Sequence, residues 1–436
     1  MATRPNDRQA LWAAIARAGG IDAYVQAQLV AGGFAAERKP TDGMSKRELA
    51  RYKAELKAEA AEKKRLKAEA WAAYKATHIV HLGEGVYFND ADDFDRFDLA
   101  EPEARLAENG LPRIDDPQAL AEALALSVPT LRWLTFHRDA ATMLHYRRFT
   151  IPKKSGGERA IWAPMDTLKS AQRWVLRHIV EPLPVHGAAH GFVPGRGIVS
   201  NAQAHSEARI LINVDLKDFF PTVTVRRVKG VFRKAGYREQ VATLLAMLCT
   251  EAPREVVRHG ETDYFIALGP RCLPQGAPTS PALTNTLCLR LDRRLSGLAR
   301  QRGWRYTRYA DDLTFSLPVK AAKGADGNVG TLLGAVRAIV EAEGFALNPK
   351  KTRICRPGGR QKVTGLIVNG AEPPRAPRAL RRMLRAAVHN LEQGKPLPEG
   401  ETVARLAGYA AFIYQTNPQE GAELLRRFAA FAGEQA

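Results

Sequence analysis

The sequence predicts an α+β protein, and two kinds of pattern predict it. Residues 304–317 and 146–163 have the pattern of β-hairpins, the second with a glycine-rich turn, and residues 210–214 form a further β-rich apolar run. Helical patterns dominate both ends, because residues 45–77 are rich in Ala, Lys and Glu and apolar residues recur at helical spacing after Pro377. With 436 residues, the chain is long enough for two or three domains and a substantial core.

Residues 1–112 are predicted to form a mostly helical N-terminal extension. Residues 7–36 have the pattern of two short helices, and residues 45–77 that of one long helix, supported by pairs such as Glu59 with Lys63. The long helix is strongly basic. It can lie along an RNA backbone, contact a partner protein or simply be solvated, and the sequence leaves these alternatives open.

The composition limits the class of protein. The net charge is +19 and the pI is about 9.9, which suits a nucleic-acid partner, although a merely basic soluble protein has the same composition. We expect no membrane span, because no run of eighteen apolar residues occurs, and no secretory signal. The four cysteines lack C-x-x-C spacing and are expected to be reduced thiols of a cytoplasmic protein: Cys249, Cys272, Cys288 and Cys355.

Three carboxylates are the candidates for catalysis. Asp311 and Asp312 fall on the tight turn of the hairpin at 304–317, where they repel each other unless a cation such as Mg²⁺ holds them. Asp215 directly follows the β-rich run at 210–214. Beside the hairpin it would complete a site for two divalent ions that clamp the attacking and leaving oxygens of a phosphoryl transfer. The alternative is that Asp215 only caps a following helical turn.

A loop rich in glycine and proline lies between these aspartates. It runs from Leu273 to Pro281, and from Pro281 onward leucines recur every four residues. Such a stripe predicts a helix that packs into the core rather than a set of ligands.

Three of these segments resemble the ordered palm motifs of reverse transcriptases. They are Asp215 with Phe219-Phe220, the loop 273–281, and Tyr309-Ala310-Asp311-Asp312. Two further elements, Asn201-Ala202-x-x-His205 and Val363-Thr364-Gly365, resemble those of bacterial retron reverse transcriptases. The resemblance covers roughly residues 125–430 and is strongest to the myxobacterial type with an N-terminal extension.

The resemblance implies a right-hand polymerase and assigns its parts. The fingers with their preceding helices would span 113–209, the palm with the catalytic aspartates and a primer-grip hairpin 210–370, and the helical thumb 371–436. We interpret residues 353–368 as that hairpin, with its turn at 357–359. His205 is interpreted as a structural histidine at the junction of fingers and palm.

The resemblance also implies roles for single residues. Asp215, Asp311 and Asp312 would be catalytic and would bind two Mg²⁺ ions with the carbonyl of Leu216. The expected nucleotide contacts are Lys153, Arg159, Phe220, Gln275 and Lys350, where Lys350 or Lys351 would serve as the acid for the leaving pyrophosphate. The expected nucleic-acid contacts are Gly195, Arg196, Val363, Thr364 and Gly365.

The implied activity is that of an RNA-directed DNA polymerase of a retron. It would use dNTPs to copy part of a structured non-coding RNA into branched multicopy single-stranded DNA, primed from an RNA 2′-hydroxyl. An effector or toxin protein and a role in antiphage defence would accompany it. The alternatives are a group II intron-like or diversity-generating reverse transcriptase, and an RNA-binding scaffold that restrains a toxin.

Overall fold

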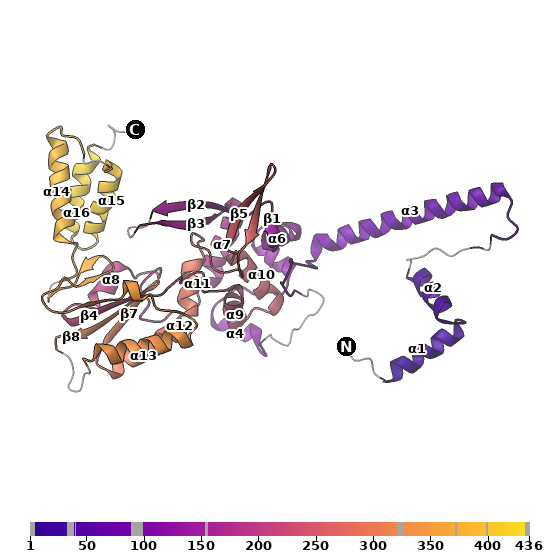
Figure 1. Cartoon of the computed structure of the whole chain (residues 1–436), viewed down its shortest axis with the longest axis horizontal. Coiled ribbons are helices and arrows are strands. Elements are labelled where there is room, and N and C mark those ends of the chain that lie inside the picture. The colour runs from indigo at the N-terminus through magenta and orange to yellow at the C-terminus, as the bar shows by residue number, and fades with distance from the viewer. Residues whose placement is uncertain are drawn as a thin grey trace. The chain divides into compact units, whose positions relative to one another are not determined.

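The computed structural model describes residues 5–32, 39, 41–88, 99–152, 156–320, 327–370, 373–397 and 400–431. The chain divides into two compact units, one of residues 1–79 with 127–129 and one of residues 80–126 with 130–436. Helices and strands both contribute to the second unit, as the sequence predicts (Figure 1). Lys153 lies outside the described residues.

The first unit consists mainly of three helices: α1 (Pro5–Arg17), α2 (Ile21–Ala31) and α3 (Lys46–Thr77). Ser45 caps α3 in a capping box with Glu48. Exposed ion pairs one turn apart, such as Lys63 with Glu59 at 2.7 Å, run along its surface. None of its residues is buried, so α3 is one long exposed helix (Figure 1), and both helical predictions for this part of the chain are confirmed.

A four-stranded antiparallel sheet forms the centre of the second unit. Its order is β7 (Arg305–Tyr309), β8 (Asp312–Pro318), β4 (Ala208–Asp215) and β9 (Arg353–Cys355). Leu211, Ile212 and Phe315 are fully buried in it. Thr314 and Ser316 alternate with the apolar residues of β8, the pattern of a half-buried strand, yet both are buried as well, because hydrogen-bonding partners cover that face too.

Smaller sheets and further helices accompany this centre. A hairpin of β2 (Tyr146–Pro152) and β3 (Glu158–Pro164) confirms the prediction for 146–163. A three-stranded sheet has the order β1 (Ala140–Ala141), β6 (Thr262–Ala267) and β5 (Arg254–His259). The helices are α4 (Pro102–Glu108), α5 (Pro117–Ala123), α6 (Val128–Thr135), α7 (Asp166–Val175) with the π-turn Leu176–Val180, α8 (Ile198–Gln203), α9 (Val225–Ala235), α10 (Glu239–Cys249), α11 (Ser280–Leu287), α12 (Leu289–Gln301) and α13 (Val329–Ala342).

The predicted hairpin over 353–368 is wrong in its pairing. β9 joins the central sheet beside β4, so it does not pair with the strand that follows it. Instead β10 (Lys362–Val363) pairs with β11 (Leu366–Ile367) across a turn at Thr364-Gly365. Both turn residues have positive φ, 44° and 92°, which is the backbone that a two-residue hairpin turn requires.

Three helices follow the β10–β11 hairpin: α14 (Arg378–Glu392), α15 (Val403–Tyr414) and α16 (Pro418–Ala429). They lie side by side (Figure 1) and bury Leu384, Leu406, Ile413 and Phe428 in a common core. The predicted helical C-terminal region is therefore present. Among the described helices none is both long and apolar enough to cross a membrane, and all four cysteines are free.

Candidate active site

The three predicted carboxylates meet at one end of two neighbouring strands. Asp215 is the last residue of β4, and the strand register places it directly opposite Asp312, the first residue of β8. Asp311 lies in the two-residue turn between β7 and β8, where Ala310 has φ 55°. The backbone N–H of Leu216 donates to the Asp311 carbonyl at 3.0 Å, which fixes the end of β4 to this turn.

Electrostatic repulsion among the carboxylates makes ionisation of Asp311 and Asp312 less favourable. Partial burial, and then repulsion from Asp311 and Asp215, raise the pKa of Asp312 to about 6. Burial and the charge of Asp215 also raise the pKa of Asp311, whereas the positive charges of Lys351 and Arg159 act in the opposite direction. Because Asp312 is exposed to solvent, we attribute its raised pKa mainly to repulsion by the two neighbouring carboxylates rather than to burial. A bound cation would relieve this repulsion.

Asp215 already has a cationic partner. Lys351 Nζ lies 2.8 Å from Asp215 Oδ2, and Asn348 Nδ2 donates to Oδ1 at 3.1 Å. In the part of the chain that the structure describes, no three acidic, histidine or cysteine side chains are arranged as a ready metal site. The hard oxygen donors suit a cation such as Mg²⁺, for which Asp215 would have to give up its contact with Lys351. Of the two adjacent lysines that the sequence offers, Lys351 rather than Lys350 makes this contact.

A buried arginine supports the turn that carries Asp311, and sequence reasoning missed it. Arg308 and Asp292 are both fully buried and form a bidentate ion pair, with the closest approach at 2.7 Å. Arg308 also donates to Asn285 Oδ1 at 3.0 Å and to the Ala310 carbonyl at 3.2 Å. The strained residue next to Asp311 is thus held by a guanidinium that is anchored in α11 and α12. A charged residue in a strand otherwise suggests solvent exposure, so the sequence gives no signal of this role.

The glycine-rich loop 190–197 packs against the same turn. A Cβ on Gly191 would lie 2.9 Å from the Ala310 nitrogen, so only glycine allows this approach. Gly195 has φ 73° and faces open space. One nitrogen of Arg196 donates to three carbonyls of the preceding segment, those of His186, Gly187 and Ala189. The structure therefore gives Arg196 a part in shaping the loop, and its contact with nucleic acid stays a prediction.

Residues predicted to contact the nucleotide lie on the β2–β3 hairpin, in the 273–281 loop and in the segment after β4. On β3, Arg159 is exposed and its charge acts on Asp311. The Gln275 carbonyl accepts from the Trp162 N–H at 2.7 Å, so the 273–281 loop is joined to the same hairpin. Phe220 is half-buried beside Phe219, with ring centroids 5.6 Å apart. These roles in nucleotide binding remain predictions.

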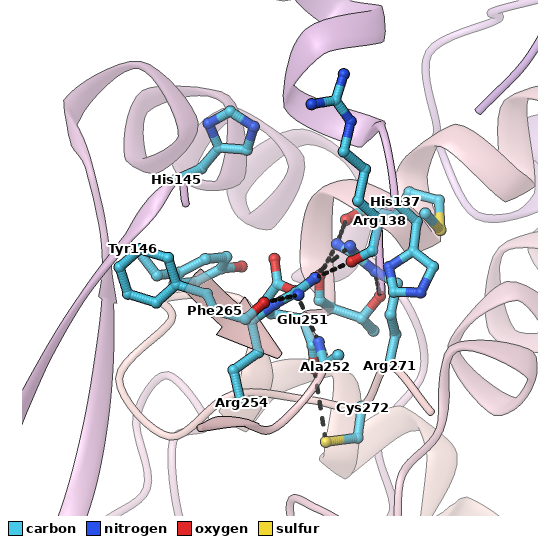
Figure 2. A network of polar contacts seen from close by, with 12 residues as sticks. His137, Arg138, His145, Tyr146, Glu251, Ala252, Arg254, Phe265, Arg271 and Cys272 are labelled. Atoms are coloured by element: carbon cyan, nitrogen blue, oxygen red, sulfur yellow. Dashed lines mark hydrogen bonds and ion pairs between the residues drawn. The ribbon is translucent and has the colours of Figure 1, made fainter. Parts of the chain in front are cut away.

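A buried ionic cluster fixes the segment that leads to Gln275. Figure 2 shows the cluster around Glu251, whose carboxylate contacts Arg254 at 3.1 Å and Arg271 at 3.6 Å. Burial raises the pKa of Glu251, but the two arginines outweigh it and lower the pKa overall. Two backbone hydrogen bonds of 3.0 Å join Glu251 to Cys272, three residues before Gln275. The sequence pattern does not reveal this cluster, because all three side chains are of types that are usually exposed.

His205 is a buried structural histidine, as interpreted from the sequence. Its Nδ1 lies 2.7 Å from the Ser316 hydroxyl and its Nε2 2.7 Å from the Thr307 hydroxyl. Burial, and then the positive charges of Arg305 and His190, lower the pKa of His205 to about 3. The ring is therefore neutral whenever the protein is folded near neutral pH.

This lowered pKa predicts loss of stability in mild acid. An unfolded histidine takes up a proton below about pH 6.5, whereas folded His205 does not, so stability is complete above that pH and falls as the pH drops towards 3. At about pH 5 the loss from this residue is roughly 2 kcal/mol. Denaturant titrations above about pH 6.5 and at about pH 5 will measure this loss of stability. His137, His145 and His190 shift in the same direction, so His205→Gln should flatten only part of the pH dependence, and an unchanged slope would contradict the prediction.

Comparison with known proteins identifies the family. Residues 151–377 match the family model described as reverse transcriptase (RNA-dependent DNA polymerase). The retron Mx162 reverse transcriptase of Myxococcus xanthus is 52% identical over 94% of this chain and 87% of its own length. The retron Mx65 enzyme of the same organism is 44% identical over 76% of this chain and 75% of its own, and the Escherichia coli retron Ec86 enzyme 34% identical over 74% and 91%.

Among solved structures, a telomerase from Candida albicans aligns over 64% of this chain and 56% of its own, with 9% identity and a TM-score of 0.39. That likeness is too distant to add to the argument. The matched residues 151–377 include strand β3, all three carboxylates and the β10–β11 hairpin. The chain therefore belongs to the retron reverse transcriptases of the myxobacterial type, and it is an RNA-directed DNA polymerase.

Proposed function

We propose that this polymerase copies part of a structured non-coding RNA into branched multicopy single-stranded DNA, starting from a 2′-hydroxyl of that RNA. The observation that carries the proposal is the meeting of Asp215, Asp311 and Asp312 at adjacent strand ends, in a chain similar to retron enzymes. The template partner is the RNA, and the substrates are dNTPs. The free cysteines suit the cytoplasm, where we place the reaction.

Two Mg²⁺ ions are the proposed cofactors. Asp215, Asp311, Asp312 and the Leu216 carbonyl would hold them, since these oxygens are hard donors and the carboxylates repel one another without a cation. When bound, Mg²⁺ would activate the attacking hydroxyl and neutralise the negative charge that develops on the phosphate. Arg159 and Lys350 would orient the triphosphate, and Gln275 would contact the nascent base pair. Gly195, Arg196 and the 363–365 turn would contact the nucleic acid.

The proposed division of the chain follows these roles. Fingers span 113–209, palm 210–370 and thumb 371–436, with residues 1–112 as an N-terminal extension. Exposed basic α3 suits contact with the RNA or with an effector protein. An effector and a role in antiphage defence complete the proposal. Deleting residues 1–79 should weaken retention of the RNA or of the effector, and unchanged retention of both would remove this part of the proposal.

The test is the nucleic acid that co-purifies with the protein expressed from its natural locus. After ribonuclease treatment, we expect a discrete DNA that carries a short, branched RNA stub, and its absence in the Asp311→Asn variant. DNA without a branch would point to another class of reverse transcriptase. RNA without any DNA, together with toxin restraint that survives Asp311→Asn, would favour the RNA-binding scaffold.

Phe220 is proposed to exclude ribonucleotides. Its ring packs beside that of Phe219, whose centroid lies 5.5 Å from the ring centroid of Phe345. This cluster of aromatic rings holds Phe220 in place. Phe220→Val should raise the use of rNTPs relative to dNTPs by roughly 10- to 200-fold, since a pocket gains about that factor when bulk is removed. Primer-extension kinetics with matched dNTP and rNTP measure the ratio. An unchanged ratio in Phe220→Val would contradict the assignment.

A further inference from the structure

A continuous chain of hydrogen bonds connects the catalytic hairpin with the turn between β10 and β11. We call it the Asn201–His205 chain. Its links are Ser316 Oγ to His205 Nδ1 (2.7 Å), His205 Nε2 to Thr307 Oγ1 (2.7 Å), Thr307 Oγ1 to Asn201 Oδ1 (2.6 Å), Asn201 Nδ2 to Thr364 Oγ1 (3.5 Å) and Thr364 Oγ1 to the Ile198 carbonyl (3.0 Å). The first four residues are nearly or fully buried, and the 3.5 Å link is the weakest.

The direction of every proton in this chain follows from its last acceptor. The Ile198 carbonyl cannot donate, so the single hydroxyl proton of Thr364 points to it, and Thr364 must accept from Asn201. The Asn201 oxygen then faces Thr307, which gives it its only proton. Thr307 therefore accepts from His205, and the imidazole carries its proton on Nε2. Ser316 donates to the unprotonated Nδ1, so the tautomer is determined.

A second polar bridge joins the same two parts of the molecule. Asn213 on β4 donates to the Lys362 carbonyl at 3.2 Å and accepts from the Thr314 hydroxyl at 3.3 Å. The strand register puts Asn213 and Thr314 opposite each other, two residues from the opposed pair Asp215 and Asp312. Side chains two residues apart share one face of a sheet. The β10–β11 hairpin is therefore tied to the face that carries the catalytic carboxylates.

The β10–β11 turn is strained and needs this support. Thr364 has φ 44°, which a β-branched residue rarely adopts, and such backbone persists only where surrounding contacts impose it. Its hydroxyl contacts α8 at two points, Ile198 and Asn201. Beside them, Ala202 packs in one buried cluster with Val363 and Leu366. Residues of the Asn-Ala-x-x-His element thus contact the Val-Thr-Gly element or the catalytic hairpin, although Asn201 and Thr364 are 163 residues apart.

We propose that Asn201 and His205 are positioning residues that hold the Thr364 turn at a fixed place relative to Asp311 and Asp312. The inference rests on the proposed function, in which this turn contacts the primer end. A rigid connection would keep the attacking hydroxyl aligned with the catalytic carboxylates. Such alignment governs the rate of the chemical step rather than the affinity for nucleotide.

The test uses two isosteric variants and their combination in the full-length protein. Thr307→Val interrupts the middle of the chain, and Thr364→Val removes its end. Each should lower kcat for extension of a DNA primer on an RNA template by about 10- to 100-fold, with the KM for dNTP nearly unchanged. If the residues act as one unit, the double variant loses about as much as the worse single variant, whereas independent effects multiply. Thr307→Ser and Thr364→Ser, which restore the hydroxyls, should recover most of kcat.

Two further measurements separate positioning from folding and from the proposed function. Thr364→Gly relieves the positive φ and should be at least as stable as Thr364→Val, yet equally slow. The ¹⁵N spectrum of the His205 ring should show protonation at Nε2 and none at Nδ1. A proton on Nδ1, multiplicative losses, or a change confined to template affinity would overturn the inference. Wild-type protein that extends no primer would instead contradict the proposed function itself.

Discussion

Replacing Asp311 by asparagine is expected to lower DNA synthesis by about 10³-fold or more, because the proposed loss of a metal ligand removes several kcal/mol of transition-state stabilisation. We expect no loss of stability against unfolding. The pKa of Asp311 is raised by burial and by the charge of Asp215, so the neutral amide removes a repulsion. We therefore expect metal-free Asp311→Asn to unfold at a temperature no lower than wild type. Primer extension and thermal denaturation in chelator measure the two effects.

Asp218 offers the matched control. It is an exposed carboxylate three residues after Asp215, with φ 46°, a conformation that asparagine tolerates well. Asp218→Asn makes the same change of charge close to the site and should retain wild-type synthesis. If both variants lost activity equally, or if Asp311→Asn remained active, the metal-ligand assignment would fail.

Replacing Arg308 by methionine is expected to have the largest effect on stability. It leaves Asp292 buried without its partner and removes the donor to the Ala310 carbonyl. Breaking a buried ion pair in this way costs about 3–5 kcal/mol. Activity should fall as well, since the turn that carries Asp311 loses its support. Urea denaturation and primer extension report the two losses.

A double variant separates the two effects. Arg308→Met with Asp292→Leu removes both charges, so much of the stability should return, because an apolar pair of similar volume often replaces a buried ion pair at little cost. Activity should stay low, since the donor from Arg308 to the Ala310 carbonyl is still missing. Arg51→Met, which breaks the exposed pair with Glu55, is the control and should cost at most about 1 kcal/mol. Full recovery of activity in the double variant would refute the positioning role of Arg308.

The sequence predicts those helices and strands whose apolar and polar residues recur at a regular spacing. The hairpin at 304–317, the long helix at 45–77 and the end of β4 at Asp215 all follow from local patterns, and each is present. The pairing of β9 with β4 does not follow from such patterns, because it depends on chain segments more than a hundred residues apart. Local turn residues at 357–359 therefore predicted the wrong hairpin.

The same limit applies to the site. Short motifs predict Asp311, Asp312 and Asp215, because their chemistry is visible in the residue types. The supporting residues Arg308 and Glu251 look like ordinary surface charges in a sequence, and only the fold reveals that they are buried. Lys351 shows an intermediate case, since the sequence offers two adjacent lysines and only the geometry decides which one reaches Asp215.

The contact between Lys351 and Asp215 means that the proposed catalytic centre carries its own counter-ion. Asp215 is 5% exposed, and an isolated charge at such a position would be costly. The Lys351 ammonium group, itself about half exposed, neutralises it. The folded chain therefore does not depend on a metal ion to balance this buried charge, and binding of the proposed metal would be an exchange of one cation for another at Asp215.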